Sequence, residues 1–153
     1  LFAKTITKKM LYSGVIAAAI VNMALNTSFY PQLLQFQAGS VAARKISQSR
    51  DLKDREIYLY EMSSHSFDFY SRAIHPYCDA YSLKGKLTGN QPIFLFADER
   101  GIETLHEHHY QYAIIEEFLH HHPTLLTIEF LNPSSRTKSL EKRYLVEVFS
   151  KAE

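Results

Sequence analysis

Apolar residues are concentrated in one run near the start of the chain, from Met10 to Leu25. As a helix this run is about 24 Å long, and extending it to Tyr30 gives enough length to cross a hydrocarbon core of about 30 Å. Tyr12 and Tyr30 would then lie at the two membrane interfaces. The pattern predicts a membrane-spanning helix in residues 1–30. A cleaved signal peptide and a buried helix of a soluble protein are the alternatives.

The charges around this run predict its orientation. Lys4, Lys8 and Lys9 precede it, and no Lys or Arg follows it before Arg44. The positive-inside rule then places this basic flank in the cytoplasm and residues 31–153 outside it, which in a bacterium is the periplasmic side of the inner membrane.

Small residues recur every four positions along the same run, as in the pair Ser13 and Ala17 and the pair Gly14 and Ala18. Such spacing lets helix backbones approach closely inside a membrane. We therefore expect one helix of a bundle rather than a lone anchor.

Beyond the apolar run, helical and strand periodicities alternate. Pro31 suits the first turn of a helix that closes before the polar connector 47–55, and residues 56–61 form a strand with both faces covered. Ser63 or Ser64 then caps a short helix that Pro76 ends. The residues of this helix expected to face the sheet are Phe67, Tyr70 and Ile74.

The remaining pattern predicts five strands and one helix, joined by turns. The strands are expected at 77–83, 92–97, 110–118, 124–131 and, closing the chain, 142–150, with a helix at 98–108 and a loop at 84–90. Because βα alternation is mixed with runs that can form hairpins, the fold class is α/β. We expect an N-terminal transmembrane helix followed by an α/β sandwich with a mixed sheet of about five to six strands.

Composition narrows the class of protein only slightly. Hydrophobic residues make up 46% and charged residues 22% of the 153, which suits a packed core rather than disorder. The formal net charge of +1 gives no basic footprint for a nucleic-acid partner. The single Cys78 excludes an intramolecular disulfide.

Signals of catalysis are sparse. The chain has no glycine-rich phosphate loop and no nucleophile elbow, and Glu116 and Glu117 are strand neighbours that point to opposite faces. Two histidine clusters could supply zinc ligands, but no Cys, Asp or Glu completes a ligand spacing that we recognise. Three adjacent histidines in a strand also cannot all reach one ion. The clusters are His106, His108 and His109, and His120, His121 and His122. We expect a solvated polar loop beside Pro123, and no catalytic, cofactor or metal residue in this segment.

Four ordered segments carry a resemblance to a known family. They are FYPQLLQFQAGSVAA, IYLYEMSSHSFDFYSR, PIFLFADERG and EFLNPSSRTKSLEKRYLVEV. Together they resemble the carboxyl-terminal end of bacterial membrane glycosyltransferases of family 39, which are GT-C enzymes similar to the aminoarabinose transferase of lipid A and to protein mannosyltransferases. The matching motif positions are Pro31, Ser66, Phe69, Tyr70, Phe130, Leu131, Asn132 and Arg136.

The resemblance implies a polytopic parent enzyme that moves a sugar from a polyprenyl-phosphate carrier to an extracytoplasmic acceptor, as in lipid A modification. The catalytic acids and the divalent metal of that family lie in early loops that this sequence does not contain. The present segment would be a non-catalytic accessory region, with the bilayer, the other transmembrane helices of the parent and the carrier-linked sugar as partners. Residues suited to contact the carrier or acceptor are Gln35, Gln37, Arg72, Arg136 and Lys138. The alternative is a stand-alone, membrane-tethered or secreted α/β binding domain.

Overall fold

The computed structural model describes residues 2–87, 91–122 and 126–149, with side chains from residue 6 onward. Contacts within the chain fall into two compact units, which divide between Gln35 and Phe36. The first unit is helical, and the second holds the sheet.

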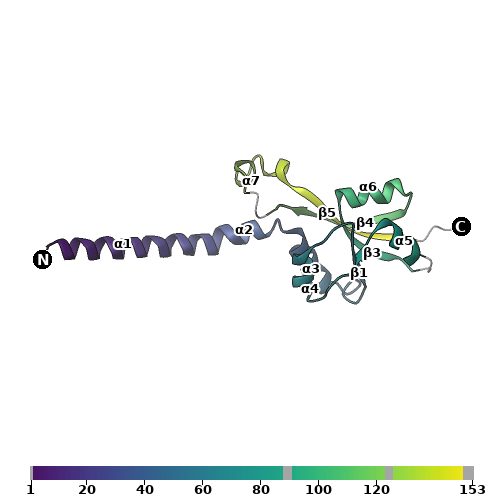
Figure 1. The fold of residues 1–153 in the computed structure, drawn as a ribbon, viewed down its shortest axis with the longest axis horizontal. Coiled ribbons are helices and arrows are strands. Elements are labelled where there is room, and N and C mark those ends of the chain that lie inside the picture. Colours follow the sequence, from purple (N-terminus) through teal and green to yellow (C-terminus); the bar gives the residue numbers. More distant parts are fainter. Residues whose placement is uncertain (1, 88–90, 123–125, 150–153) are drawn as a thin grey trace. The chain divides into compact units, whose positions relative to one another are not determined.

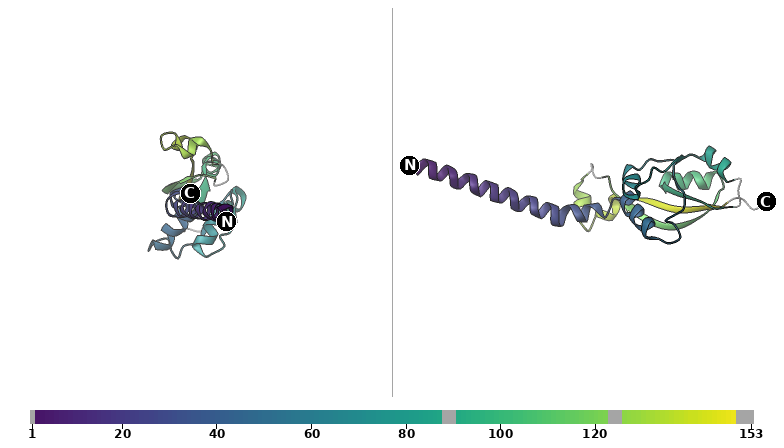
Figure 2. Two further views of the ribbon diagram at one scale, coloured as in Figure 1. Left: turned by 90° about the vertical axis from the view of Figure 1, so that its left-hand side faces the viewer. Right: turned by 90° about the horizontal axis from the view of Figure 1, so that it is seen from below.

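The first unit is one uninterrupted helical rod (Figure 1, Figure 2). Helix α1 (Phe2–Ala24) passes through a π-helical turn, η1 (Leu25–Phe29), into α2 (Tyr30–Leu34). The 29 residues Ile6–Leu34 have the length and apolar composition of a membrane span, and none of them is buried. The predicted continuous helix over residues 10–30 is confirmed.

Polar side chains of this helix bond within the helix itself. Ser13 Oγ donates to the Met10 carbonyl at 3.0 Å, and Thr27 Oγ1 donates to the Met23 carbonyl at 2.8 Å. The Asn26 side-chain amide donates to both the carbonyl and the side-chain oxygen of Asn22, each at 2.8 Å. Such local bonds satisfy these polar groups without water, which suits a helix of membrane-span composition.

The helix expected to start at Pro31 and continue to the polar connector is interrupted. Pro31 does lie in the first turn of α2, but α2 ends at Leu34. Gln37 has φ −96° and ψ 83°, which are not helical angles, and α3 (Ala38–Gln48) begins after it. The break separates the apolar rod from the first helix of the second unit.

The strands of the described residues form one five-stranded sheet in the order β2-β1-β3-β5-β4. The strands are β1 (Ile57–Tyr60), β2 (Tyr77–Cys78), β3 (Ile93–Asp98), β4 (Gln111–His120) and β5 (Glu141–Phe149). Strand β1 is parallel to β2 and β3, whereas β5 is antiparallel to β3 and β4. The sheet is therefore mixed, and the predicted α/β class is confirmed.

Helices cover both faces of the sheet (Figure 1). On one face lie α3 and α4 (His65–Ser71), and on the other lie α5 (Ala80–Lys86) and α6 (Glu99–Glu107). Phe94 and Phe96 of β3 point into the first layer, and Leu95 and Ala97 point into the second. Because β3 is buried on both faces, its sequence is a continuous apolar run, and this run was the basis of its prediction.

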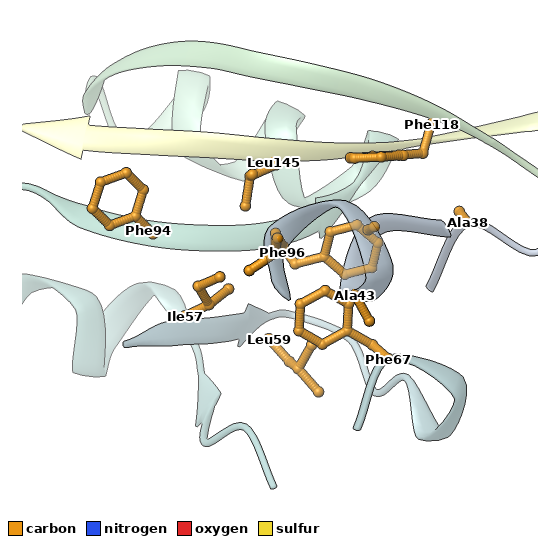
Figure 3. Close-up of a cluster of buried hydrophobic side chains, with 11 residues drawn as sticks. Ala38, Ala43, Ile57, Leu59, Phe67, Phe94, Phe96, Phe118 and Leu145 are labelled. Atoms are coloured by element: carbon orange, nitrogen blue, oxygen red, sulfur yellow. The ribbon is translucent and has the colours of Figure 1, made fainter. Parts of the chain in front are cut away.

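Helix α4 is correctly capped but shorter than predicted. Ser64 accepts a hydrogen bond from the Phe67 amide at 3.4 Å. The fully buried Phe67 ring stacks on Phe96 with 4.7 Å between centroids (Figure 3). The helix ends at Ser71 because Arg72 adopts the left-handed conformation, φ 59°. Ile74 therefore lies beyond the helix and is 93% exposed, so its expected packing on the sheet is wrong.

Two expected strands are largely helical. The strand over 77–83 stops at Cys78 because Asp79 accepts a hydrogen bond from the Ser82 amide at 2.7 Å and starts α5. This helix also takes up the first residues of the expected loop 84–90, of which 88–90 lie outside the described residues. In place of the strand over 124–131, a short helix, α7 (Ile128–Leu131), follows a cap by Thr127; residues 124 and 125 lie outside the described residues.

Gly39 allows α3 and α4 to meet closely. A Cβ atom at this position would lie 2.4 Å from Ser66 Oγ and 2.6 Å from Ser64 Oγ. A larger residue would displace these two hydroxyls and would also lie only 3.0 Å from the Phe67 backbone nitrogen. This close approach brings the beginning of α3 to the residues that follow β1, where the candidate site lies.

Candidate functional site

The site lies where the chain leaves β1 and β3 toward opposite faces of the sheet. Strand β1 continues into α4 on one face, and β3 continues into α6 on the other. In α/β sheets, ligands bind outside the carboxyl ends of two such neighbouring parallel strands.

A pocket of about 300 Å³ occupies this position, and we call it the switch-point pocket. Its walls come from the start of α3, the residues after β1, the end of β4 and the start of β5. The polar residues that line it include Gln37, Ser64, Ser66, His120, His122 and Arg143. Segments that are far apart in the sequence, including the first turn of α4, therefore contribute polar groups to one hollow.

Arg143 is the fixed cation of the switch-point pocket, and its side chain is only 11% exposed. One guanidinium nitrogen, Nη1, lies 2.8 Å from Asp98 Oδ2, and the other, Nη2, lies 3.2 Å from Glu141 Oε2. Asp98 also accepts a hydrogen bond from the Gly101 amide at 2.8 Å, which caps α6. The two carboxylates hold the guanidinium in place at the pocket wall.

The histidines 120–122 alternate in direction, as strand geometry predicts. The rings of His120 and His122 lie together, with centroids 5.1 Å apart. The ring of His121 lies flat against Phe130 at 3.5 Å, and its backbone amide donates to the Phe36 carbonyl at 2.7 Å. His121 is buried, so the expected solvated loop does not describe this residue.

Burial lowers the pKa of His120 to about 4, with a further contribution from the nearby Arg143 and His122. This imidazole is therefore neutral at pH 7, and one ring nitrogen keeps a free lone pair. Its Nδ1 atom is buried and has no hydrogen-bond partner within the described part of the chain.

Of the histidine clusters, only the second brings potential metal ligands together among the described residues. His120, His122 and Glu141 each offer one donor atom, and these atoms lie within 4.8 Å of one another. His106, His108 and His109 are exposed near the end of α6. A second hollow of about 150 Å³ lies against the same triad.

The residues predicted to contact a carrier or acceptor are dispersed. Gln37 lines the switch-point pocket. Arg136 donates from Nε to the Phe130 carbonyl at 2.8 Å, and its guanidinium lies over the rings of Phe36 and Phe130 at 5.2 and 5.3 Å. The other three, Gln35, Arg72 and Lys138, are exposed and line none of the hollows described above.

Sequence reasoning missed Arg143 and Glu141, although a signal was present. His120 lies opposite Glu141 in the antiparallel pairing of β4 with β5. His122 follows the last residue of β4 by two positions and Arg143 follows Glu141 by two, and a spacing of two keeps side chains on one side of an extended backbone. The β4–β5 register, which places the two histidines beside Glu141 and Arg143, cannot be deduced from the sequence of either strand alone.

The pocket offers hydrogen-bond donors to a ligand oxygen, although the charge of Arg143 is balanced by two carboxylates. Arginine donates paired hydrogen bonds to phosphate or carboxylate, and serine hydroxyls and imidazoles add further donors. A nearby Ser71, His75 and Asp68 set resembles a hydrolase triad only in composition. Ser71 Oγ and Asp68 Oδ1 both lie within hydrogen-bond distance of the same nitrogen, His75 Nδ1, at 3.4 and 2.9 Å. A triad base needs its two ring nitrogens for two different partners.

Fold and site together define a mixed α/β domain that follows a helix of membrane-span character. Comparisons of the chain with models of protein families, with curated proteins and with solved structures gave no match.

Proposed function

We propose that the chain is the carboxyl-terminal accessory region of a polytopic membrane glycosyltransferase. In this proposal the parent transfers a sugar from a polyprenyl-phosphate carrier to an acceptor outside the cytoplasm. The apolar helix is the last span in the inner membrane, the domain from about residue 31 onward lies on the periplasmic side, and this segment carries no catalytic group of its own.

The observation that carries the membrane part of the proposal is the exposed span Ile6–Leu34. Side chains such as Ile16, Ile20 and Met23 are 59%, 63% and 69% exposed, which is costly in water and favourable in lipid. The class of the parent rests on the resemblance of the four segments quoted above.

The switch-point pocket supports a role in contacting the carrier or the acceptor. A polyprenyl-phosphate presents a phosphate group, and Arg143 presents a preorganised guanidinium at the pocket wall. Gln37 is the predicted contact residue best placed for this role. Arg136 is less suited, because it does not line this pocket and its guanidinium lies over the rings of Phe36 and Phe130.

Transfer of sugar in membranes that contain the full-length gene product tests the proposal. Gln37→Glu would bring a negative charge to the pocket, so we expect the KM for the carrier to rise several-fold. The matched control is Gln111→Glu at the exposed start of β4, away from the pocket. This control should leave the KM unchanged.

Two outcomes would contradict the proposal in different ways. Absence of any transfer by the full-length product would favour the stand-alone, membrane-tethered binding domain. Transfer with an unchanged carrier KM in Gln37→Glu would leave the transferase class in place but remove the pocket from carrier contact.

A further inference from the structure

We infer that His120, His122 and Glu141 form a binding site for one divalent transition-metal ion, with Zn²⁺ as the best-suited ion. The sequence alone predicted no metal residue, so this site follows from the structure. It also stands apart from the proposed transferase function, since it depends only on side chains of this domain.

The geometry of the triad needs little change to hold an ion. The three donor atoms lie within 4.8 Å of one another, and His122 Nε2 is 4.0 Å from Glu141 Oε2. Donor atoms around a tetrahedral Zn²⁺ lie roughly 3.4 Å apart, given bonds of about 2.0–2.2 Å. The side chains of His122 and Glu141 are 52% and 54% exposed, so rotamer changes can close the difference.

The backbone sets the three ligands on one side of an antiparallel strand pair. His120 ends β4, Glu141 begins β5, and the two residues are register partners. His122 follows two positions after His120, so its ring returns to the same side. His121 is turned away and is held against Phe130.

The charges near the triad also suit a cation. Arg143 contributes one positive charge but contacts two carboxylates, Asp98 and Glu141. Arg143, Asp98 and Glu141 together have one formal negative charge in excess. A divalent ion would therefore meet a net attraction in spite of the neighbouring guanidinium.

An unsatisfied buried nitrogen provides an independent sign of a missing partner. His120 Nδ1 is buried and lacks a hydrogen-bond partner among the described residues. A buried polar atom without a partner is unfavourable, and coordination through this atom would remove that cost. The adjoining hollow of about 150 Å³ gives room for an ion with a water.

The ligand types favour zinc. Two imidazoles and one carboxylate are a set that Zn²⁺ binds with a fourth position open. Because His120 and His122 also line the switch-point pocket, that open position is accessible to a water or to an anionic ligand oxygen.

Direct metal titration of the full chain in detergent tests the site. The protein carries a purification tag without histidine, is stripped with EDTA and is titrated with Co²⁺ and then with Zn²⁺ against a chromophoric chelator. We expect one ion per chain and the visible absorption of four- or five-coordinate Co²⁺, which Zn²⁺ abolishes. Glu141→Gln and His122→Ala should each weaken Zn²⁺ binding by at least about tenfold.

The double variant His108→Ala with His109→Ala is the matched control, because these exposed histidines lie outside the triad. It should keep the wild-type affinity and the Co²⁺ spectrum. Circular dichroism confirms that each variant is folded; Glu141 and His122 are exposed, so their replacement leaves the core intact. Unchanged Zn²⁺ affinity in folded Glu141→Gln, or loss of binding in the control, would overturn the inference. Neither readout involves sugar transfer, so failure of the metal site and failure of the proposed function are distinguishable.

Discussion

Two phenylalanines in α4 differ sharply in their surroundings. Phe67 is fully buried against Phe96, whereas Phe69, two residues later, is 76% exposed. Phe67→Ala should lower the free energy of unfolding by about 3–5 kcal/mol, because it leaves a cavity and removes a stacked ring. Chemical denaturation of the full chain in detergent measures the change.

Phe69→Ala is the matched control for that measurement, and we expect a loss below about 0.5 kcal/mol. Helical periodicity in the sequence placed Phe67, and not Phe69, on the face of the helix toward the sheet. Equal losses in the two variants would show that α4 presents a different face to the sheet.

His120 makes a pH-dependent contribution to stability. Its pKa is lowered to about 4 in the folded chain, chiefly by burial, whereas an unfolded histidine has a pKa of about 6.5. Between these values the unfolded chain binds the proton more readily, so stability is retained above pH 6.5 and lost as the pH falls toward 4. For protein kept metal-free with EDTA, we expect His120 to account for about 1–2 kcal/mol of lost stability between pH 7 and pH 5.

The comparison of wild type with His120→Gln isolates this contribution from the other titrating groups. The variant should show a smaller fall in the free energy of unfolding over the same pH range. Parallel pH profiles for the two proteins would mean that His120 is hydrated in the folded state.

At the level of elements, Asp98 connects β3, α6 and β5. Its Oδ1 caps α6 through the Gly101 amide, and its Oδ2 pairs with Arg143 of β5. Asp98→Asn keeps an oxygen for the cap but loses the ion pair, so we expect a loss of about 1 kcal/mol. Asp98→Ala loses both interactions and should cost about 2 kcal/mol.

Urea unfolding of both variants, compared with Asp51→Asn in the exposed connector, measures these losses. Because Arg143 would lose one of its two carboxylate partners, Asp98→Asn should also move the side chain within the switch-point pocket. If Asp98→Asn lost as much unfolding free energy as Asp98→Ala, the ion pair with Arg143, and not the cap of α6, would be the source of the stability.

Elements were predictable where one periodicity dominated. Strand β3 is a short apolar run, and α6 starts at an Asp cap with Ile102 and Leu105 facing inward, so both were found. Around Asp79, the aromatic and β-favouring residues suggested a strand, and the capping box between Asp79 and Ser82 outweighed them. Between Thr127 and Leu131 a side-chain cap likewise outweighed an apolar, β-rich composition.

The candidate site was less predictable than the elements, because it depends on strand register and tertiary contact. The β4–β5 pairing sets His120 opposite Glu141, and the close approach permitted by Gly39 brings α3 beside Ser64 and Ser66. Residues chosen for charge alone, such as Arg72 and Lys138, remain exposed outside the pocket. Arg136 was chosen for its cation in the same way, and it packs over the rings of Phe36 and Phe130.

For the whole molecule, the proposed function requires that the α/β unit and the basic end of the helix lie on opposite sides of a membrane. The exposed apolar span Ile6–Leu34 has the required length, and the lysines at its start are the basis of the predicted direction. A domain on the cytoplasmic side would have no access to an extracytoplasmic acceptor.

Thiol labelling of intact bacterial cells measures this sidedness most directly. Cys78 is buried and serves as the silent background, while Lys53→Cys and Ile6→Cys place exposed thiols in the domain and near the basic end of the helix. With a maleimide that crosses the outer membrane but not the inner membrane, Lys53→Cys should react in intact cells, and Ile6→Cys should react only after permeabilisation. Protection of Lys53→Cys together with reaction of Ile6→Cys in intact cells would contradict the proposed orientation, and labelling of both would contradict a membrane span.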